Sequence, residues 1–318
     1  MPTFPGVLEA RRRISPYLPR TSLFTYPQLD RLVGTSIWVK HENHQPVGAF
    51  KVRGGVNLIS QMSDEERARG VVSASTGNHG QSVAYAARPF GVKATIYVPE
   101  NANPSKVRSM EDLGAEVIAH GRDFDEAREQ CARVAEEQGR RYIHSGNEPH
   151  LIEGVGTYSL EIFEDVPDLD VLIVPIGGGS GAAGACLVAK TISPSTKVIG
   201  VQAEAAPAAY LSWKARSLVE DQMNTAAEGL ATRTAFELPQ RILWEQLDDF
   251  VLVSEAELRD ATRTMIEATR NLVEGAGASA FAAALKIKDQ LVGRRVAIVC
   301  SGGNISPAQI AELFSAPR

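Results

Sequence analysis

Short apolar runs alternate with longer helical patterns along almost the whole chain, and this alternation most restricts what the chain can fold into. Several runs are apolar throughout, which is typical of strands buried on both faces of a parallel sheet. Parallel strands need helical crossovers, so the alternation predicts an α/β fold. The predicted strands are residues 36–40, 70–73, 94–98, 115–119, 171–176, 197–202, 250–253 and 295–300.

The segment 123–136 has a clear helical pattern. Phe124, Ala127, Cys131 and Val134 recur there at the spacing of one helix face. We therefore expect these four side chains to be buried against a sheet.

Length and charge exclude several classes of protein. A chain of 318 residues suggests about two domains, at about 150 residues each. Its 33 Lys and Arg against 38 Asp and Glu give a net charge of −5, which is not the basic footprint of a nucleic-acid-binding protein. The N-terminus lacks the apolar core of a signal peptide, and three scattered cysteines do not suggest a disulfide framework. These features predict a cytoplasmic protein with no membrane partner.

A glycine-rich loop follows the most apolar predicted strand and precedes a helical pattern. Its residues are Gly177, Gly178, Gly179, Ser180 and Gly181. Glycines let backbone N–H groups approach an anion, and a helix N-terminus adds partial positive charge. Because ligands of α/β folds bind at the carboxyl ends of strands, this loop predicts a phosphate site.

The same loop also fits a second interpretation. Residues 179–184 match GxGxxG, and Glu204 ends the next predicted strand 20 residues after Gly184. That is the fingerprint of dinucleotide binding. An NAD-binding oxidoreductase, or a phosphate-binding sensor without catalysis, is therefore an alternative from this motif alone.

Three further segments carry chemistry. Residues 75–82 offer hydroxyls, an amide and N–H groups at a helix start, which can hold a carboxylate. Lys51 follows Phe50 and precedes Gly54 and Gly55. A lysine in an apolar pocket can lose its proton and bond to an aldehyde, although most lysines are solvated. Ser301, after the last strand, is either a helix cap or a neutral hydroxyl for a heterocyclic nitrogen.

Together these segments resemble the fold-type II pyridoxal-phosphate enzymes, most closely the serine/threonine dehydratase (threonine ammonia-lyase) and serine racemase family. Residues 48–54, 76–81, 177–181 and 301–304 occur in the family's order and at its separations. The resemblance implies a tryptophan synthase β-like fold with two open, twisted, mainly parallel sheets flanked by helices. It implies a large cofactor-binding domain from residues 1–69 and 144–318, and a small mobile domain, residues 70–143, that closes over the substrate.

The resemblance also implies a role for each matching residue. Lys51 would bond covalently to pyridoxal 5′-phosphate and then remove the substrate Cα proton, with Thr76 as a second catalytic residue. The cofactor-binding residues would be Phe50, Lys51, Asn78, Gly177, Gly178, Gly179, Ser180, Gly181, Gly229, Glu274 and Ser301. The substrate-binding residues would be Ser75, Thr76, Gly77, Asn78, His79 and Arg128, although Arg128 also suits a solvated helix position.

The implied reaction is an α,β-elimination that turns a β-hydroxy amino acid into a 2-oxo acid and ammonia. The substrate would be L-threonine, L-serine or a 3-hydroxylated relative; serine or amino-acid racemisation, or dehydration of a hydroxyaspartate, is the alternative on the same fold. Gln202, Ala206 and Ala208 stand where racemases carry cation ligands, so we expect no metal. The resemblance further implies a homodimer.

Overall fold

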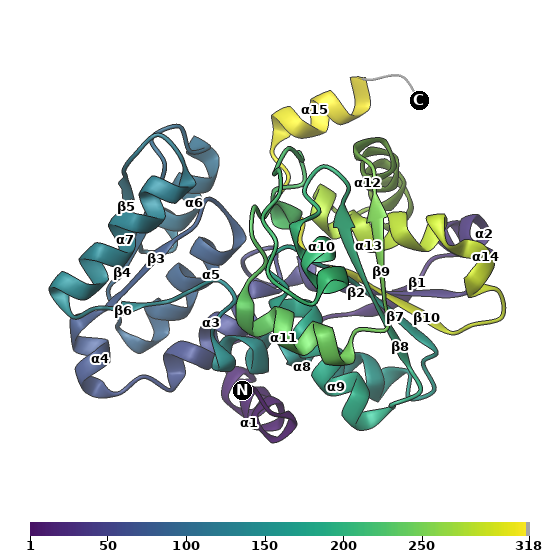
Figure 1. Ribbon diagram of the computed structural model, residues 1–318, viewed down its shortest axis with the longest axis horizontal. Helices are drawn as coiled ribbons and strands as arrows, with labels where there is room; N and C mark the ends of the chain where they lie inside the picture. Colours follow the sequence, from purple (N-terminus) through teal and green to yellow (C-terminus); the bar gives the residue numbers. More distant parts are fainter. Residues whose placement is uncertain (316–318) are drawn as a thin grey trace.

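Two separate β-sheets flanked by helices form the framework of the molecule (Figure 1). The structure is a computed structural model that describes residues 1–315. Within these residues the larger sheet has six strands, and all but the edge strand β1 run parallel to their neighbours. Their order is β1 (Leu23–Thr25), β2 (Ile37–His41), β10 (Val296–Cys300), β7 (Val171–Pro175), β8 (Lys197–Ala203) and β9 (Asp249–Val253).

The smaller sheet is parallel throughout and is covered by helices on both faces. Its order is β5 (Glu116–Ala119), β4 (Ala94–Val98), β3 (Val71–Ala74) and β6 (Arg141–Tyr142). Val72 packs with α7 (Phe124–Gln138), whereas Val71 and Ile96 belong to the cluster that includes α5 (Asn78–Ala87). Successive side chains of a strand point to opposite faces, so covering both faces explains the continuous apolar runs.

Helices also cover both faces of the larger sheet. Leu172 of β7 packs with α8 (Pro149–Asp165) and α9 (Ser180–Ile192), and Ile173 packs with α12 (Glu255–Thr269) and α13 (Gly275–Lys286). No helix in the described part of the chain is long and apolar enough to cross a membrane. The other helices are α1 (Phe4–Ile14), α2 (Pro27–Val33), η1 (Glu42–His44), α3 (Lys51–Ser60), α4 (Asp64–Arg69), η2 (Arg88–Phe90), α6 (Pro104–Asp112), α10 (Ala208–Ala215), η3 (Glu228–Leu230), α11 (Glu237–Gln246), α14 (Lys288–Leu291) and α15 (Pro307–Ser315).

The eight predicted strands are all present, each with bounds within one residue of the prediction. The α/β fold class with two mainly parallel sheets is thereby confirmed. Strands β1 and β6 were not predicted. They have three and two residues, and neither contains a buried residue, so neither has an apolar signal.

The predicted buried face of α7 is correct for three of its four residues. Ala127, Cys131 and Val134 are buried. Phe124 was wrongly expected to be buried: its side chain is at the first position of the helix and is 38% exposed. Periodicity assigns residues to a helix face but does not show which end positions are left exposed.

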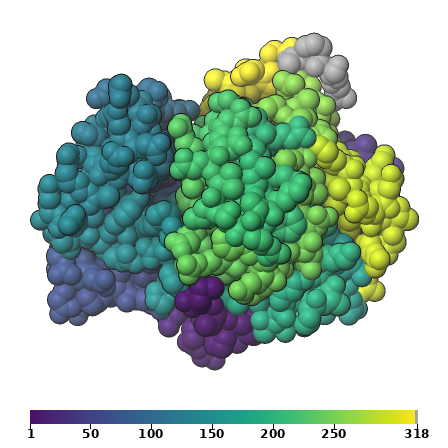
Figure 2. All heavy atoms as spheres, in the orientation of Figure 1, coloured from purple at the N-terminus to yellow at the C-terminus, as the bar shows by residue number. Residues whose placement is uncertain are grey.

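The two sheets belong to two lobes that meet along an indented line on the surface (Figure 2). Helices α3 and α5 join the lobes at close range, because a Cβ atom on Gly55 would lie 2.4 Å from the Ser82 hydroxyl oxygen. The smaller sheet lies within residues 71–142. The proposed domain boundaries near residues 70 and 143 stay a prediction.

Candidate active site

Lys51 is the first residue of α3 and lies beside the loop that follows β10. The Phe50 N–H donates to the Ser301 carbonyl at 3.1 Å, and the Gly303 N–H donates to the Gly48 carbonyl at 2.9 Å. Gly48 has a φ of +67°, which glycine adopts without strain. These bonds bring together two sequence motifs from near the two ends of the chain.

The amine of Lys51 is held by two neutral oxygens. Its Nζ donates to the Ser145 carbonyl at 2.7 Å and to the Ser180 hydroxyl at 2.9 Å. Burial lowers the pKa of this amine from 10.5 to about 8. A neutral amine is the form that attacks a carbonyl carbon or accepts a proton, so Lys51 suits both tasks.

The glycine-rich loop between β7 and α9 needs glycine because other parts of the protein approach it closely. A Cβ atom on Gly177 would lie 2.2 Å from the Gly229 carbonyl oxygen. A Cβ atom on Gly178 would lie 2.2 Å from the Phe236 ring. Gly179 has a φ of +83° and precedes the first residue of α9. The loop is therefore packed into one shape against η3 and Phe236.

Several backbone donors of this loop face no protein acceptor. Within residues 1–315, the N–H groups of Gly177, Gly178 and Gly179 make no hydrogen bond to the chain. They lie at the N-terminus of α9, whose first residue, Ser180, accepts from Lys51. Unpartnered N–H groups at a helix start suit a phosphate. The start of α9 is also adjacent to the Lys51 amine.

Phe50 and Ser301 also lie close to Lys51. A Cβ atom on Gly181 would lie 3.1 Å from the Phe50 ring, which places that ring against the start of α9. Ser301 is buried directly after β10, and its hydroxyl makes no hydrogen bond within the described chain. Since none of the described residues occupies it, this hydroxyl is available to a bound group.

The loop between β3 and α5 is shaped by Ser75. The Ser75 hydroxyl accepts from the Gly77 N–H at 3.2 Å and from the Gly80 N–H at 2.9 Å. This hydroxyl therefore fixes the loop, in addition to any contact with a substrate. Thr76 and Gly77 are half-buried between the strand and the helix.

Asn78 links the small lobe to the large one. Its amide nitrogen donates to the Glu274 carboxyl at 2.7 Å, and its amide oxygen accepts from Asn304 at 2.7 Å. Burial raises the pKa of Glu274. A Cβ atom on Gly302 would lie 2.2 Å from this carboxyl, so the glycine makes room for the contact.

Two histidines near Lys51, the buried His79 and the half-buried His144, are neutral. Burial, with the charge of Lys51, lowers the pKa of His79 to about 3 and that of His144 to about 4. His79 Nε2 lies 3.2 Å from the Ile143 carbonyl oxygen, and its Nδ1 has no partner among the described residues. His144 was not among the predicted site residues, because it follows the two-residue strand β6, which has no recognisable signal.

The structure does not bring Arg128 into contact with the other predicted residues. Its guanidinium lies 3.4 Å from Asp125 on the same helix, and its side chain is 46% exposed. Its charge nevertheless helps lower the pKa of His144. Its predicted contact with a substrate stays a prediction.

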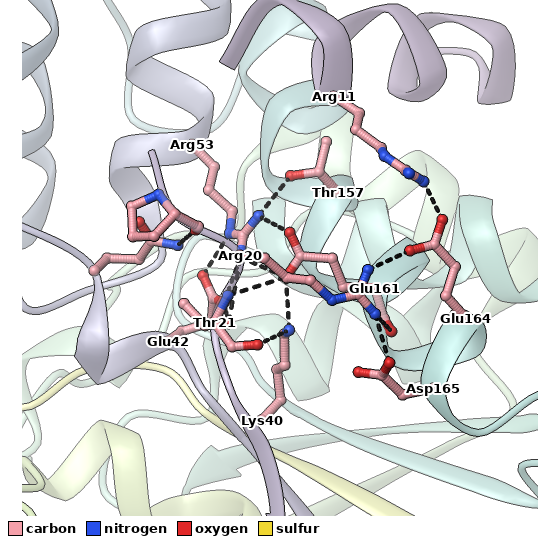
Figure 3. A network of polar contacts seen from close by, with 12 residues as sticks. Arg11, Arg20, Thr21, Lys40, Glu42, Arg53, Thr157, Glu161, Glu164 and Asp165 are labelled. Carbon is pink, nitrogen blue, oxygen red and sulfur yellow. Dashed lines mark hydrogen bonds and ion pairs between the residues drawn. The ribbon is translucent and has the colours of Figure 1, made fainter. Parts of the chain in front are cut away.

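A buried ionic network supports the helix that carries Lys51 (Figure 3). Arg53 Nε and Nη1 each lie 2.7 Å from a carboxylate oxygen, of Glu42 and Glu161 respectively. Lys40 Nζ lies 2.6 Å from the other Glu161 oxygen. Two cations and two anions balance, which is the condition under which buried charges are tolerated. The network fixes α3 close to its first residue, Lys51.

Comparison with known proteins gives one consistent result. A family model described as pyridoxal-phosphate dependent enzyme matches residues 14–302. The L-threonine ammonia-lyase of Thermotoga maritima is 41% identical over 316 residues, which are 99% of this chain and 79% of that protein. The L-threo-3-hydroxyaspartate ammonia-lyase of Saccharomyces cerevisiae is 39% identical over 317 residues, 99% of this chain and 97% of that protein.

A solved structure shows the same architecture. Maize serine racemase superposes with a TM-score of 0.93 and 33% sequence identity. The match covers 99% of this chain and 97% of the racemase.

Proposed function

The chain belongs to the family of pyridoxal-phosphate dependent enzymes and is a dehydratase of the ammonia-lyase type; from this premise we propose that Lys51 is its catalytic base and that its substrate is a β-hydroxy amino acid. The products would be a 2-oxo acid and ammonia. The observation that carries the proposal is the buried Lys51 amine, 2.9 Å from Ser180 at the start of α9. The relatives give no support to the oxidoreductase interpretation of the glycine loop.

The residues around this amine suit pyridoxal 5′-phosphate, the cofactor of the family. Lys51 would hold the aldehyde carbon, and the unpartnered N–H groups of residues 177–179, with Ser180 and Gly181 at the start of α9, would hold the phosphate. The Ser301 hydroxyl would face the pyridine nitrogen. Phe50, Asn78, Gly229 and Glu274 would line the ring. The chemistry that the cofactor supplies when bound is electron withdrawal from the substrate Cα.

Lys51 would then serve as the base at the substrate Cα. Its pKa of about 8 leaves an appreciable fraction of the amine neutral near pH 7. Its two hydrogen-bond acceptors, Ser145 and Ser180, orient Nζ without placing a negative charge beside it. The lowered pKa would leave part of the amine free to accept a proton, and the two acceptors would hold it in a fixed orientation.

The loop from Ser75 to His79 would bind the substrate carboxylate. Thr76 and Gly77 border the site, and the start of α5 contributes partial positive charge. Ser75 and Asn78 would act partly by holding the loop in place, since both are already hydrogen-bonded within the protein. Arg128 would join only after a rearrangement of its pair with Asp125.

The preferred substrate would be L-threonine, L-serine or L-threo-3-hydroxyaspartate. Two of these appear in the names of the relatives from Thermotoga and yeast. The test is release of 2-oxo acid from each amino acid by the purified enzyme. Release from none of the three, with cofactor bound, would overturn the proposal.

A second candidate activity is racemisation, favoured by the likeness to maize serine racemase. Thr76 would be the residue that returns a proton on the opposite face, since it carries a hydroxyl beside the loop. Chiral analysis of residual serine in the same reaction separates the two activities.

We also propose a cytoplasmic homodimer with a closing small domain. Cys131, Cys186 and Cys300 are free and buried, which suits a reducing compartment. Phe24 and Leu272 are 50% and 55% exposed, and strand β1 leaves one edge of the large sheet open. Exposed apolar side chains and an open strand edge are features that a partner subunit would cover.

A further inference from the structure

Lys106 of α6 makes an ion pair across the two lobes with Glu228 of η3. Only 13% of the Lys106 side chain is exposed, against 46% for Glu228. The cation is therefore the more enclosed member of the pair. Glu228 can exchange this contact for water at small cost, whereas Lys106 needs an anion nearby.

The ammonium of Lys106 lies beside the loop proposed to bind the substrate carboxylate. A Cβ atom on Gly77 would be 4.0 Å from Lys106 Nζ. The charge of Lys106 also acts on Glu274. It lowers the pKa of that carboxyl, whereas burial, the larger effect, raises it. Lys106 thus places a positive charge of the small lobe next to this loop.

The carboxylate site otherwise has no formal positive charge of its own. Residues 75–80 contain no Lys or Arg, and His79 and His144 are neutral at physiological pH. Lys51 is committed to the cofactor, and Arg128 is paired with Asp125. Hydrogen bonds from N–H groups alone leave the negative charge of a buried carboxylate uncompensated.

We propose that Lys106 is a substrate-binding residue that exchanges Glu228 for the α-carboxylate of the amino acid, an inference that rests on the proposed dehydratase function. Lys106 lines a cavity of about 190 Å³, so its side chain has space in which to move away from Glu228. Its lining includes Lys106, Glu228, Gly229, Glu274 and Asn304. The exchange breaks one ion pair and forms another, so no charge is left buried alone.

The test measures, by calorimetry, the binding to the holoenzyme of two ligands that cannot undergo β-elimination. L-alanine has the carboxylate but no β-hydroxyl to lose, and L-alaninamide lacks the negative charge. Lys106→Gln is expected to weaken L-alanine binding about tenfold or more, because a hydrogen bond to a charged group is lost, and to leave L-alaninamide binding unchanged. Arg108→Gln, on the same helix, is the matched control and should change neither.

Glu228→Gln separates this role from that of a simple latch between lobes. If Lys106 binds the substrate carboxylate, removing the charge of Glu228, which competes for the same ammonium, should leave L-alanine binding unchanged or tighten it. If the ion pair only holds the lobes together, Glu228→Gln should weaken binding as much as Lys106→Gln, and the inference is wrong. Equal losses for L-alanine and L-alaninamide in Lys106→Gln would also overturn it.

The inference can still be tested if Lys106→Gln loses its cofactor or if the dehydratase proposal fails. Should Lys106→Gln fail to retain cofactor, the direction of the Glu228→Gln effect alone decides. Should the wild type bind L-alanine but release no 2-oxo acid from any β-hydroxy amino acid, the dehydratase proposal fails. The ratio of L-alanine to L-alaninamide affinities still tests Lys106 in that case.

Discussion

Lys51 and Ser180 are joined by a hydrogen bond of 2.9 Å from Nζ to Oγ, which ties the first residue of α3 to the first residue of α9. The Lys51 amine is therefore in direct contact with the N-terminus of α9, which we propose as the phosphate site. Catalysis would therefore depend on how the starts of these two helices meet.

The packing of the glycine loop can be tested at Gly178. Gly178→Ala would place a methyl group 2.2 Å from the Phe236 ring, so we expect a loss of about 1–3 kcal/mol in the free energy of unfolding. Phe236→Leu makes room for that methyl group. The double variant should therefore lose less than the sum of the two single losses, as measured by denaturant titration. Strictly additive losses would show that the two residues do not touch.

The buried ionic network can be tested at Arg53. Arg53→Met leaves the buried Glu42 and Glu161 with one cation between them, and we expect a loss of about 3–5 kcal/mol in unfolding free energy. Arg241→Met is the control, because its pair with Glu237 at 2.6 Å is exposed and should matter by less than about 1 kcal/mol. Equal effects in the two variants would contradict the structural role of the network.

The pKa of Lys51 predicts how capture of cofactor depends on pH. Only the neutral amine attacks the aldehyde, so the rate at which apoenzyme binds pyridoxal phosphate should rise with pH and level off above about 8. The rate is followed by the appearance of the yellow colour. N-acetyl-lysine is the control, since a free lysine amine has a pKa of about 10.4 and its rate should continue to rise. A protein profile that follows the free amine would show that Lys51 is solvated.

Much of the fold was predictable because the strands are buried on both faces. Runs such as 94–98 and 171–176 carry no polar alternation, and this marks them clearly. Strand β1 is a partly exposed edge and β6 has two residues, so neither has such a signal. Phe124 shows the limit of periodicity, since it lies on the apolar face but is exposed at the first position of its helix.

The candidate site was predictable where residues follow strands directly. Ser180 and Ser301 belong to such motifs, whereas Lys51 begins a helix some way beyond β2 and was identified from its combination with the other segments. Hydrogen bonds link Lys51 to Ser180 and its neighbour Phe50 to Ser301. The contacts of Asn78 with Glu274 and of Lys106 with Glu228 join residues of different lobes. Pairings of that kind depend on how the lobes meet, which no local pattern records.

The central claim is tested most directly by locating the covalent bond to the cofactor. The purified holoenzyme is reduced with borohydride, and its intact mass and peptide masses are measured. We expect one reduced cofactor per chain, on the peptide that contains Lys51, and none in Lys51→Ala. A label on another lysine, or no label after saturation with pyridoxal phosphate, would contradict the account.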